Sequence, residues 1–187
     1  QSYVPGVTAE QSFTGAIKYV QSEITPVLYF TTGHGELDYA SDYSLLVATM
    51  KNNNYDVKDL QTFDLTEIPA DCAALIMAQP EKDISADEKA VYEAYLKGGG
   101  SLMVVAGYSN AKFPILNQLL ASFNLEISND KVREGDVNYQ MNNDAYYMRA
   151  IAPTGTLTTE LVDGFTLMEN VRGMNILSNA KEWITTE

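Results

Sequence analysis

The chain has 187 residues, of which 45% are hydrophobic and 20% are charged, as in globular rather than disordered proteins. Its 25 acidic and 12 basic side chains give a net charge of −13, which repels nucleic-acid phosphates and anionic lipid headgroups. We therefore expect no nucleic-acid partner and no peripheral membrane surface. The single cysteine, Cys72, excludes an internal disulfide and is expected to act as a small buried hydrophobic residue.

The chain begins with a lead-in segment, residues 1–25, for which a short helix is predicted. Phe13 and Ile17 have the spacing of one face of that helix. Pro26 then ends any helix and opens the first strand. We expect residues 26–187 to form a single α/β domain.

Strands and helices are predicted to alternate through most of this domain. The predicted strands are 27–32, 55–60, 73–78 and 101–106, of which the first, third and fourth are apolar enough to be buried. The faces that the predicted helices bury are Tyr43, Leu46, Val47 and Met50, then Val91, Ala94 and Tyr95, then Leu116, Leu119, Leu120 and Phe123. This alternation indicates right-handed βαβ units and a three-layer sandwich around a mostly parallel, Rossmann-like sheet.

Local signals mark the boundaries of the second of these helices. Ser85 and Glu88 form a capping box, in which each side chain satisfies a free amide at the helix start. Gly98 and the two glycines after it end the helix. Beyond Leu125, where a short strand is predicted, the pattern weakens. From about residue 131 it is less regular, and edge strands are expected over 151–167.

A glycine-flanked turn after the first strand carries the only histidine of the chain. It reads Gly33, His34, Gly35, Glu36. Loops after such strands lie over the carboxyl edge of the sheet, where ligands usually bind. The glycines suit backbone that turns sharply or approaches a ligand closely.

His34 has several interpretations in this turn. It can act as a general base, as a metal ligand or as a hydrogen-bonding contact for a ligand or partner, with Glu36 orienting the ring. It can equally tie its own turn to neighbouring backbone. Because the chain has no second histidine and no cysteine cluster, any metal would need carboxylates such as Asp38 or Asp42, and we expect no metal.

Nucleotide and serine-hydrolase motifs are absent from the chain. Asp38 stands where the third glycine of a dinucleotide-binding turn belongs, and Glu36 and Asp42 would face a pyrophosphate with negative charge. The chain has no Walker sequence and no Gly-x-Ser-x-Gly elbow. We therefore expect no cofactor.

Two further loops are predicted at the same edge of the sheet. Gln79 follows the third strand, and Tyr108, Ser109 and Asn110 follow the fourth. Because the carboxyl ends of parallel strands meet at one edge, these side chains and the glycine-flanked turn are expected to line one crevice. Such groups suit a glycan or a peptide, although an ordinary solvated rim has the same polar composition.

Several segments together resemble the extracytoplasmic domain of the gliding-motility-type (GldG-like) auxiliary components of bacterial ABC transporters. The resemblance covers roughly residues 10–130. Its most specific parts are the Gly33–Glu36 turn and the glycine pair before the fourth strand. The segments that carry it are Ala16–Val20, Tyr29–Glu36, Ile68–Asp71, Gln79–Pro80 with Asp83–Ser85 and Glu88, and Tyr95–Gly99.

The resemblance implies a membrane-anchored protein whose α/β domain lies outside the cytoplasm, with spanning helices beyond this sequence. It also implies an architecture similar to class I glutamine amidotransferases, without their chemistry, because the elbow cysteine and its partner histidine are missing. The implied partners are membrane or ATPase-associated subunits of the transporter, and a surface glycan or peptide. We expect a non-enzymatic binding domain. The alternatives are a glycan or peptide hydrolase that uses His34 and Glu36, and a carbohydrate-binding module that uses Tyr108.

Overall fold

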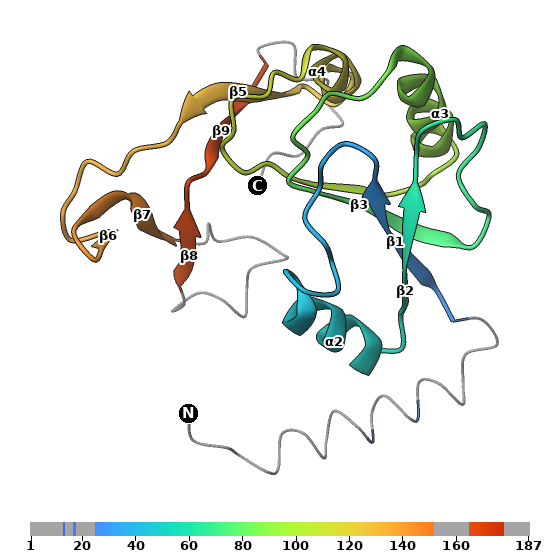
Figure 1. Cartoon of the computed structure of the whole chain (residues 1–187), viewed down its shortest axis with the longest axis horizontal. Coiled ribbons are helices and arrows are strands. Elements are labelled where there is room, and N and C mark those ends of the chain that lie inside the picture. Colours follow the sequence, from blue (N-terminus) through green and yellow to red (C-terminus); the bar gives the residue numbers. More distant parts are fainter. Residues whose placement is uncertain (1–12, 14–16, 18–24, 152–164, 178–187) are drawn as a thin grey trace. The chain divides into compact units, whose positions relative to one another are not determined.

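The computed structural model describes residues 25–151 and 165–177, together with Phe13 and Ile17 (Figure 1). These residues belong to two compact units. The first unit runs to Pro80 and continues over Ser85–Val105, and the second contains Glu81–Ile84 and everything from Ala106.

The first unit is built on a parallel sheet of four strands in the order β2-β1-β3-β4. This arrangement confirms the predicted parallel α/β fold. Leu28 in the central strand pairs with Val57 on one side and with Ala74 on the other. The strands are β1 (Val27–Thr32), β2 (Asp56–Gln61), β3 (Cys72–Ala78) and β4 (Leu102–Val105).

Two helices cover opposite faces of this sheet, α2 (Ser44–Asn52) and α3 (Ala86–Lys97) (Figure 1). Alternate residues of a strand point to opposite faces. Phe30 therefore packs toward Val47 of α2 in one core cluster, whereas Thr31 points to the other face. The α2 boundaries agree with the prediction, but Leu46 is 38% exposed, so the predicted apolar face of this helix is only partly buried.

The buried face of α3 differs from the prediction. Val91 and Tyr95 are only partly buried and Ala94 is exposed, whereas the buried residues of this helix are Glu88 and Tyr92. The predicted capping box is present, and Gly98 follows the helix as expected. The predicted buried face of α3 was wrong because Glu88, the capping-box residue, itself points into the interior. Tyr92 follows Glu88 by four positions and therefore lies on the same face of the helix.

The fourth predicted strand is present but is not buried within its unit. β4 is an edge strand, and Met103 in it is 51% exposed. An edge strand has a neighbour on one side only, so its apolar composition does not ensure burial. Cys72 at the start of β3 is likewise only partly buried, and its Sγ lies 3.5 Å from the Tyr95 hydroxyl.

The second unit holds one helix and two small antiparallel sheets among its described residues. Leu116, Leu119 and Leu120 are buried, as predicted for the helix. Asp83 accepts hydrogen bonds from the amides of Ile115 and Leu116 in the first turn of that helix. The elements are α4 (Pro114–Ala121), β5 (Leu125–Lys131) paired with β9 (Arg172–Ile176), and β6 (Gln140–Met141), β7 (Asp144–Ile151) and β8 (Phe165–Glu169).

Two predictions fall partly outside the described residues. Phe13 and Ile17 are helical and are 72% and 58% exposed, and the remainder of the predicted lead-in helix is not described. Edge strands were expected over 151–167, and β8 begins at Phe165, whereas residues 152–164 lie outside the described part.

Candidate functional site

The turn after β1 directs its histidine inward. Gly33 and Gly35 have φ angles of +118° and +78°, a region that residues with a Cβ atom rarely adopt. Both glycines are exposed, whereas His34 between them is only 5% exposed. The glycines thus form a sharp turn that places the imidazole inside the first unit.

Both ring nitrogens of His34 face a carboxylate. Nε2 lies 3.2 Å from each carboxylate oxygen of Glu88, the first-turn residue of α3. Nδ1 lies 3.4 Å from Oε1 of Glu36, which is a charge–charge contact rather than a short hydrogen bond. The side chains of Glu36 and Glu88 are 2% and 4% exposed, so the ring lies between two buried carboxylates.

Neutral donors hold each of these carboxylates in place. The Thr31 hydroxyl and the His34 backbone amide donate to Glu36, at 3.0 and 2.7 Å. The Thr62 hydroxyl and the Ser85 amide donate to Glu88, each at 2.8 Å. Hydrogen bonds of this kind favour the ionised form of a buried carboxyl group. We call this group of side chains around His34, Glu36 and Glu88 the histidine cluster. It connects β1, the turn after β1, the end of β2 and the start of α3.

The electrostatics of the cluster follow from this arrangement. The interaction with Glu36 raises the pKa of His34, burial opposes this effect, and the charge of Glu88 adds to it. Burial by itself would raise the pKa of Glu36 and of Glu88. For Glu36, hydrogen bonds from His34 and the turn backbone outweigh burial and lower the pKa. For Glu88, hydrogen bonds from Ser85 and Thr62 do the same. The arrangement thus favours an imidazolium between two carboxylates.

Sequence reasoning missed three members of this cluster. The capping box identified Glu88 as a cap and gave no sign of its second contact. Thr62 directly follows β2 and belongs to no recognisable motif. Tyr92 is 1% exposed, and within the described part of the chain its hydroxyl makes no hydrogen bond of ordinary geometry, although the Thr62 side chain is near it. Burial raises the pKa of Tyr92. The one available signal was that Tyr92 follows Glu88 by four residues and so shares its helix face.

The loops after β1 and β3 meet, as predicted. The amide of Leu37 donates to the carbonyl of Ala78 at 3.2 Å, and the side-chain amide of Gln79 donates to the Tyr43 hydroxyl at 3.2 Å. Gln79 has a φ of +54°. In the order β2-β1-β3-β4, the connections diverge between β1 and β3, which is where ligands bind in related sheets. Here the first loop itself crosses that point.

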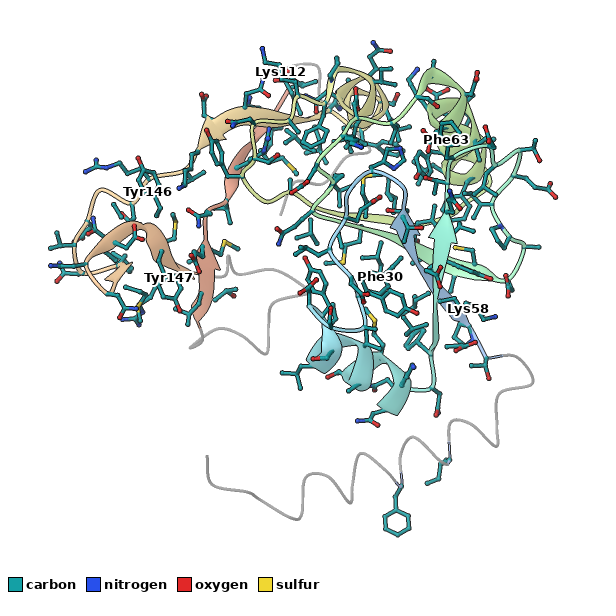
Figure 2. The ribbon with its side chains drawn as sticks, viewed as in Figure 1. Phe30, Lys58, Phe63, Lys112, Tyr146 and Tyr147 are labelled. Atoms are coloured by element: carbon teal, nitrogen blue, oxygen red, sulfur yellow. The ribbon has the colours of Figure 1, made fainter. Side chains whose placement is uncertain are left out.

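A hollow of about 450 Å³ lies beside the turn. Phe30 and Tyr39 stack in it, with ring centroids 5.0 Å apart, and Figure 2 shows Phe30 between the sheet and α2. Asp38 and Asp59, which are exposed, make the wall partly acidic, whereas the carboxylate of Glu36 is buried beside His34. The lining consists of Phe30, Thr31, Thr32, Glu36, Leu37, Asp38, Tyr39, Ala40 and Asp59.

The three other candidates, Tyr108, Ser109 and Asn110, belong to the second unit. Asn110 is exposed, and Tyr108 is 40% exposed, with the Lys131 ammonium 5.5 Å from its ring centroid. Ser109 accepts a hydrogen bond from the guanidinium of Arg172 at 3.1 Å. That these residues share a crevice with His34 stays a prediction.

The contact of Arg172 with the 107–111 loop was not predicted from the sequence. It is 7% exposed and donates to the carbonyls of Gly107, Ser109 and Ala111. A guanidinium has five donors and suits several acceptors at once. Its role is to hold the 107–111 loop against β9, which no local pattern in the sequence indicated.

Neither a metal site nor a spanning helix is found in the described residues. No group of three or more histidine, cysteine, aspartate or glutamate side chains there has an arrangement that suits a metal ion. Over the same residues, no helix has both the length and the apolar character needed to cross a membrane.

Burial raises the pKa of the Cys72 thiol, which disfavours a reactive thiolate.

Comparison with known proteins gives a fold and a family. The solved structure titled "mmIFT52 N-terminal domain" has a TM-score of 0.61 to this chain, with 16% sequence identity. The match covers 81% of this chain and 69% of the chain in that structure. At that identity the likeness concerns the fold alone. No curated protein matches the chain significantly. Residues 25–151, more than half of the chain, match the ABC transporter auxiliary family, described as an ABC-type uncharacterized transport system. The chain therefore belongs to this family of ABC transporter auxiliary proteins.

Proposed function

We propose that this domain is a non-enzymatic auxiliary component that works by binding membrane or ATPase-associated subunits of its transport system. The observation that carries the proposal is the position of His34. Its side chain is 7% exposed and a buried carboxylate lies at each ring nitrogen, so the ring is enclosed rather than presented to a substrate. A histidine held in this way shapes the turn and leaves the neighbouring surface to bind a partner.

The hollow beside the turn is the surface that we assign to the partner. Phe30 is 1% exposed and supports the half-buried Tyr39 ring that stacks on it, so Tyr39 is the aromatic side chain that a partner can reach. The exposed Asp38 and Asp59 add negative charge. Aromatic faces and carboxylates together favour an ammonium or guanidinium group. Lys58, next to Asp59, pairs instead with Asp56 and Asp71, at 3.5 and 3.9 Å. A basic segment of a transporter subunit fits this chemistry.

Co-purification with the transporter subunits tests the assignment. Asp59→Asn in the hollow is expected to weaken capture of the partner at least tenfold. Glu67→Gln, the same change of charge at an exposed position outside the hollow, is expected to leave capture unchanged. Equal capture by the two variants would remove the hollow from the interface. Turnover of glycan or peptide substrates that disappears in a folded His34→Ala variant would favour the hydrolase alternative instead.

A glycan-binding role is the second candidate, and one observation favours it. Tyr108 and Tyr146 are 40% and 36% exposed, and Lys131 lies over both rings, at 5.5 and 4.1 Å. Exposed aromatic rings stack on sugar rings, and a lysine adds hydrogen-bond donors. A glycan array should then give signals that are lost in Tyr108→Ala and kept in Phe63→Ala, an exposed aromatic residue of the other unit. A blank array would reject this role.

We also propose that the full-length protein is membrane-anchored and carries this domain on the extracytoplasmic face. The GldG-like resemblance supports this location, together with a link to gliding-motility-type systems and the amidotransferase-like architecture. Protease added to intact spheroplasts is expected to digest the domain. Protection until the membrane is lysed would place it on the cytoplasmic side.

A further inference from the structure

We propose that the Gly33–Glu36 turn is a proton-controlled switch, which is held in place while His34 carries a proton on both ring nitrogens and is released when one is lost. The inference rests on the proposed function only in its last step, which concerns the docking hollow. The switch itself is a property of the isolated chain.

The geometry requires the doubly protonated ring. A neutral imidazole has one N–H group and one nitrogen lone pair. In this cluster Nε2 lies 3.2 Å from Glu88 and Nδ1 lies 3.4 Å from Glu36. Either neutral tautomer would therefore direct a lone pair at a carboxylate oxygen. Only the imidazolium makes favourable contacts at both positions.

Among the described residues, the groups that act on His34 carry no positive charge. Its own turn contributes Glu36 and α3 contributes Glu88, and these are the charges that act on the ring. The neutral groups around the carboxylates are the hydroxyls of Thr31 from β1 and Thr62 from β2, with the buried Tyr92 hydroxyl on α3. Loss of the imidazolium proton leaves two buried carboxylates without a counter-charge, which is strongly unfavourable.

The turn is the element best able to respond. Glu88 belongs to a regular helix and keeps its capping bonds with Ser85. Glu36 is held by one hydroxyl and by the turn's own backbone. A Cβ built on Gly33 would meet nothing within 4 Å, so the turn has open space around it. Because Glu36 and Leu37 line the hollow, a shift of the turn changes the proposed docking surface.

Nuclear magnetic resonance of the whole chain, labelled with ¹⁵N in histidine, tests the switch directly. His34 is the only histidine, so the ring signals come from one residue. We expect a titration midpoint above the ordinary histidine pKa of about 6.5, with both nitrogens protonated below that midpoint. The amide signals of Gly33, Gly35 and Leu37 should shift with the same midpoint. The amide of Gly99, in a glycine turn at the other end of α3, should not.

A variant series adds an independent check. Glu36→Gln is expected to lower the midpoint by at least half a pH unit, whereas Glu93→Gln, which removes a half-buried partner of Lys89, should leave it unchanged. A ring that titrates at or below 6.5, or turn amides that stay fixed while the ring titrates, would overturn the switch. Failure of partner capture would leave these spectra unchanged, so the two proposals fail separately.

Discussion

Nε2 of His34 lies 3.2 Å from both carboxylate oxygens of Glu88, although the two residues are 54 positions apart in the chain. This contact connects the only histidine to the residue that also completes the capping box of α3. One carboxylate thus caps the start of α3, neutralises a buried cation and positions the loop at the carboxyl edge of the sheet. The stability of the unit and the shape of its proposed binding surface depend on the same group.

The free energy of unfolding is expected to be greatest between about pH 4.5 and 6.5, the ordinary glutamate and histidine pKa values, and to fall on both sides. The pKa of His34 is raised in the folded state, so its contribution is complete below the unfolded pKa and is lost as pH rises through the folded value. The pKa values of Glu36 and Glu88 are lowered, so their contribution is lost as pH falls through those values. Urea unfolding at a series of pH values measures both limbs. A flat profile between pH 5 and 9 would contradict the His34 contribution.

Removing the Glu88 carboxylate should destabilise the first unit more than removing a helix cap alone. Ser85→Ala deletes the hydroxyl that accepts the Glu88 amide at 3.1 Å, and such a change costs about 1 kcal/mol. Glu88→Ala also leaves a buried charge without its partner, which costs about 3–5 kcal/mol. Urea denaturation of the two variants at pH 7 gives the comparison. Equal losses would mean that the ion pair adds nothing to the cap.

Tyr92→Phe is expected to leave stability unchanged or to raise it by about 1 kcal/mol. The Tyr92 hydroxyl is buried and makes no hydrogen bond of ordinary geometry with the described residues, although the Thr62 side chain is near it, and burial of a poorly bonded hydroxyl is unfavourable. Tyr95→Phe is the matched control on the same helix, because its hydroxyl bonds the carbonyl and the amide of Ser101, each at 3.2 Å. That control should lose about 1 kcal/mol. Thermal unfolding of both variants decides the point, and a destabilised Tyr92→Phe would show that the hydroxyl has a partner.

Gly33→Ala should be destabilising for a reason of backbone conformation alone. The φ angle of +118° is unfavourable for alanine, but a Cβ there meets nothing within 4 Å. We expect a loss of about 1–3 kcal/mol. Gly135 also has open space around a Cβ, without the unusual φ, so Gly135→Ala is the control and should be neutral. Chemical denaturation of both variants measures the difference, which vanishes if the turn readily adopts another conformation.

Local patterns predicted the elements well because they depend on neighbouring residues. The apolar run of β1, the capping box at Ser85 and the glycine stop after Lys97 are each complete within a few positions of the chain. Burial was predicted less well. Met103 is exposed because β4 is an edge strand. The composition of a strand does not determine its position in the sheet, so this exposure could not be predicted from the sequence.

The sequence by itself determined the parallel α/β fold of the first unit, the turn at Gly33–Glu36 and the start of α3. These follow from residue periodicity, glycine conformation and capping, which are all local. Only the tertiary structure decided that Glu88 faces His34, that Thr62 bonds the same carboxylate, and that Tyr92 is buried beside them. The physical reason is that the charge and hydrogen bonding of a buried group depend on which distant elements pack against it. That packing is settled by strand order and helix placement rather than by any single motif.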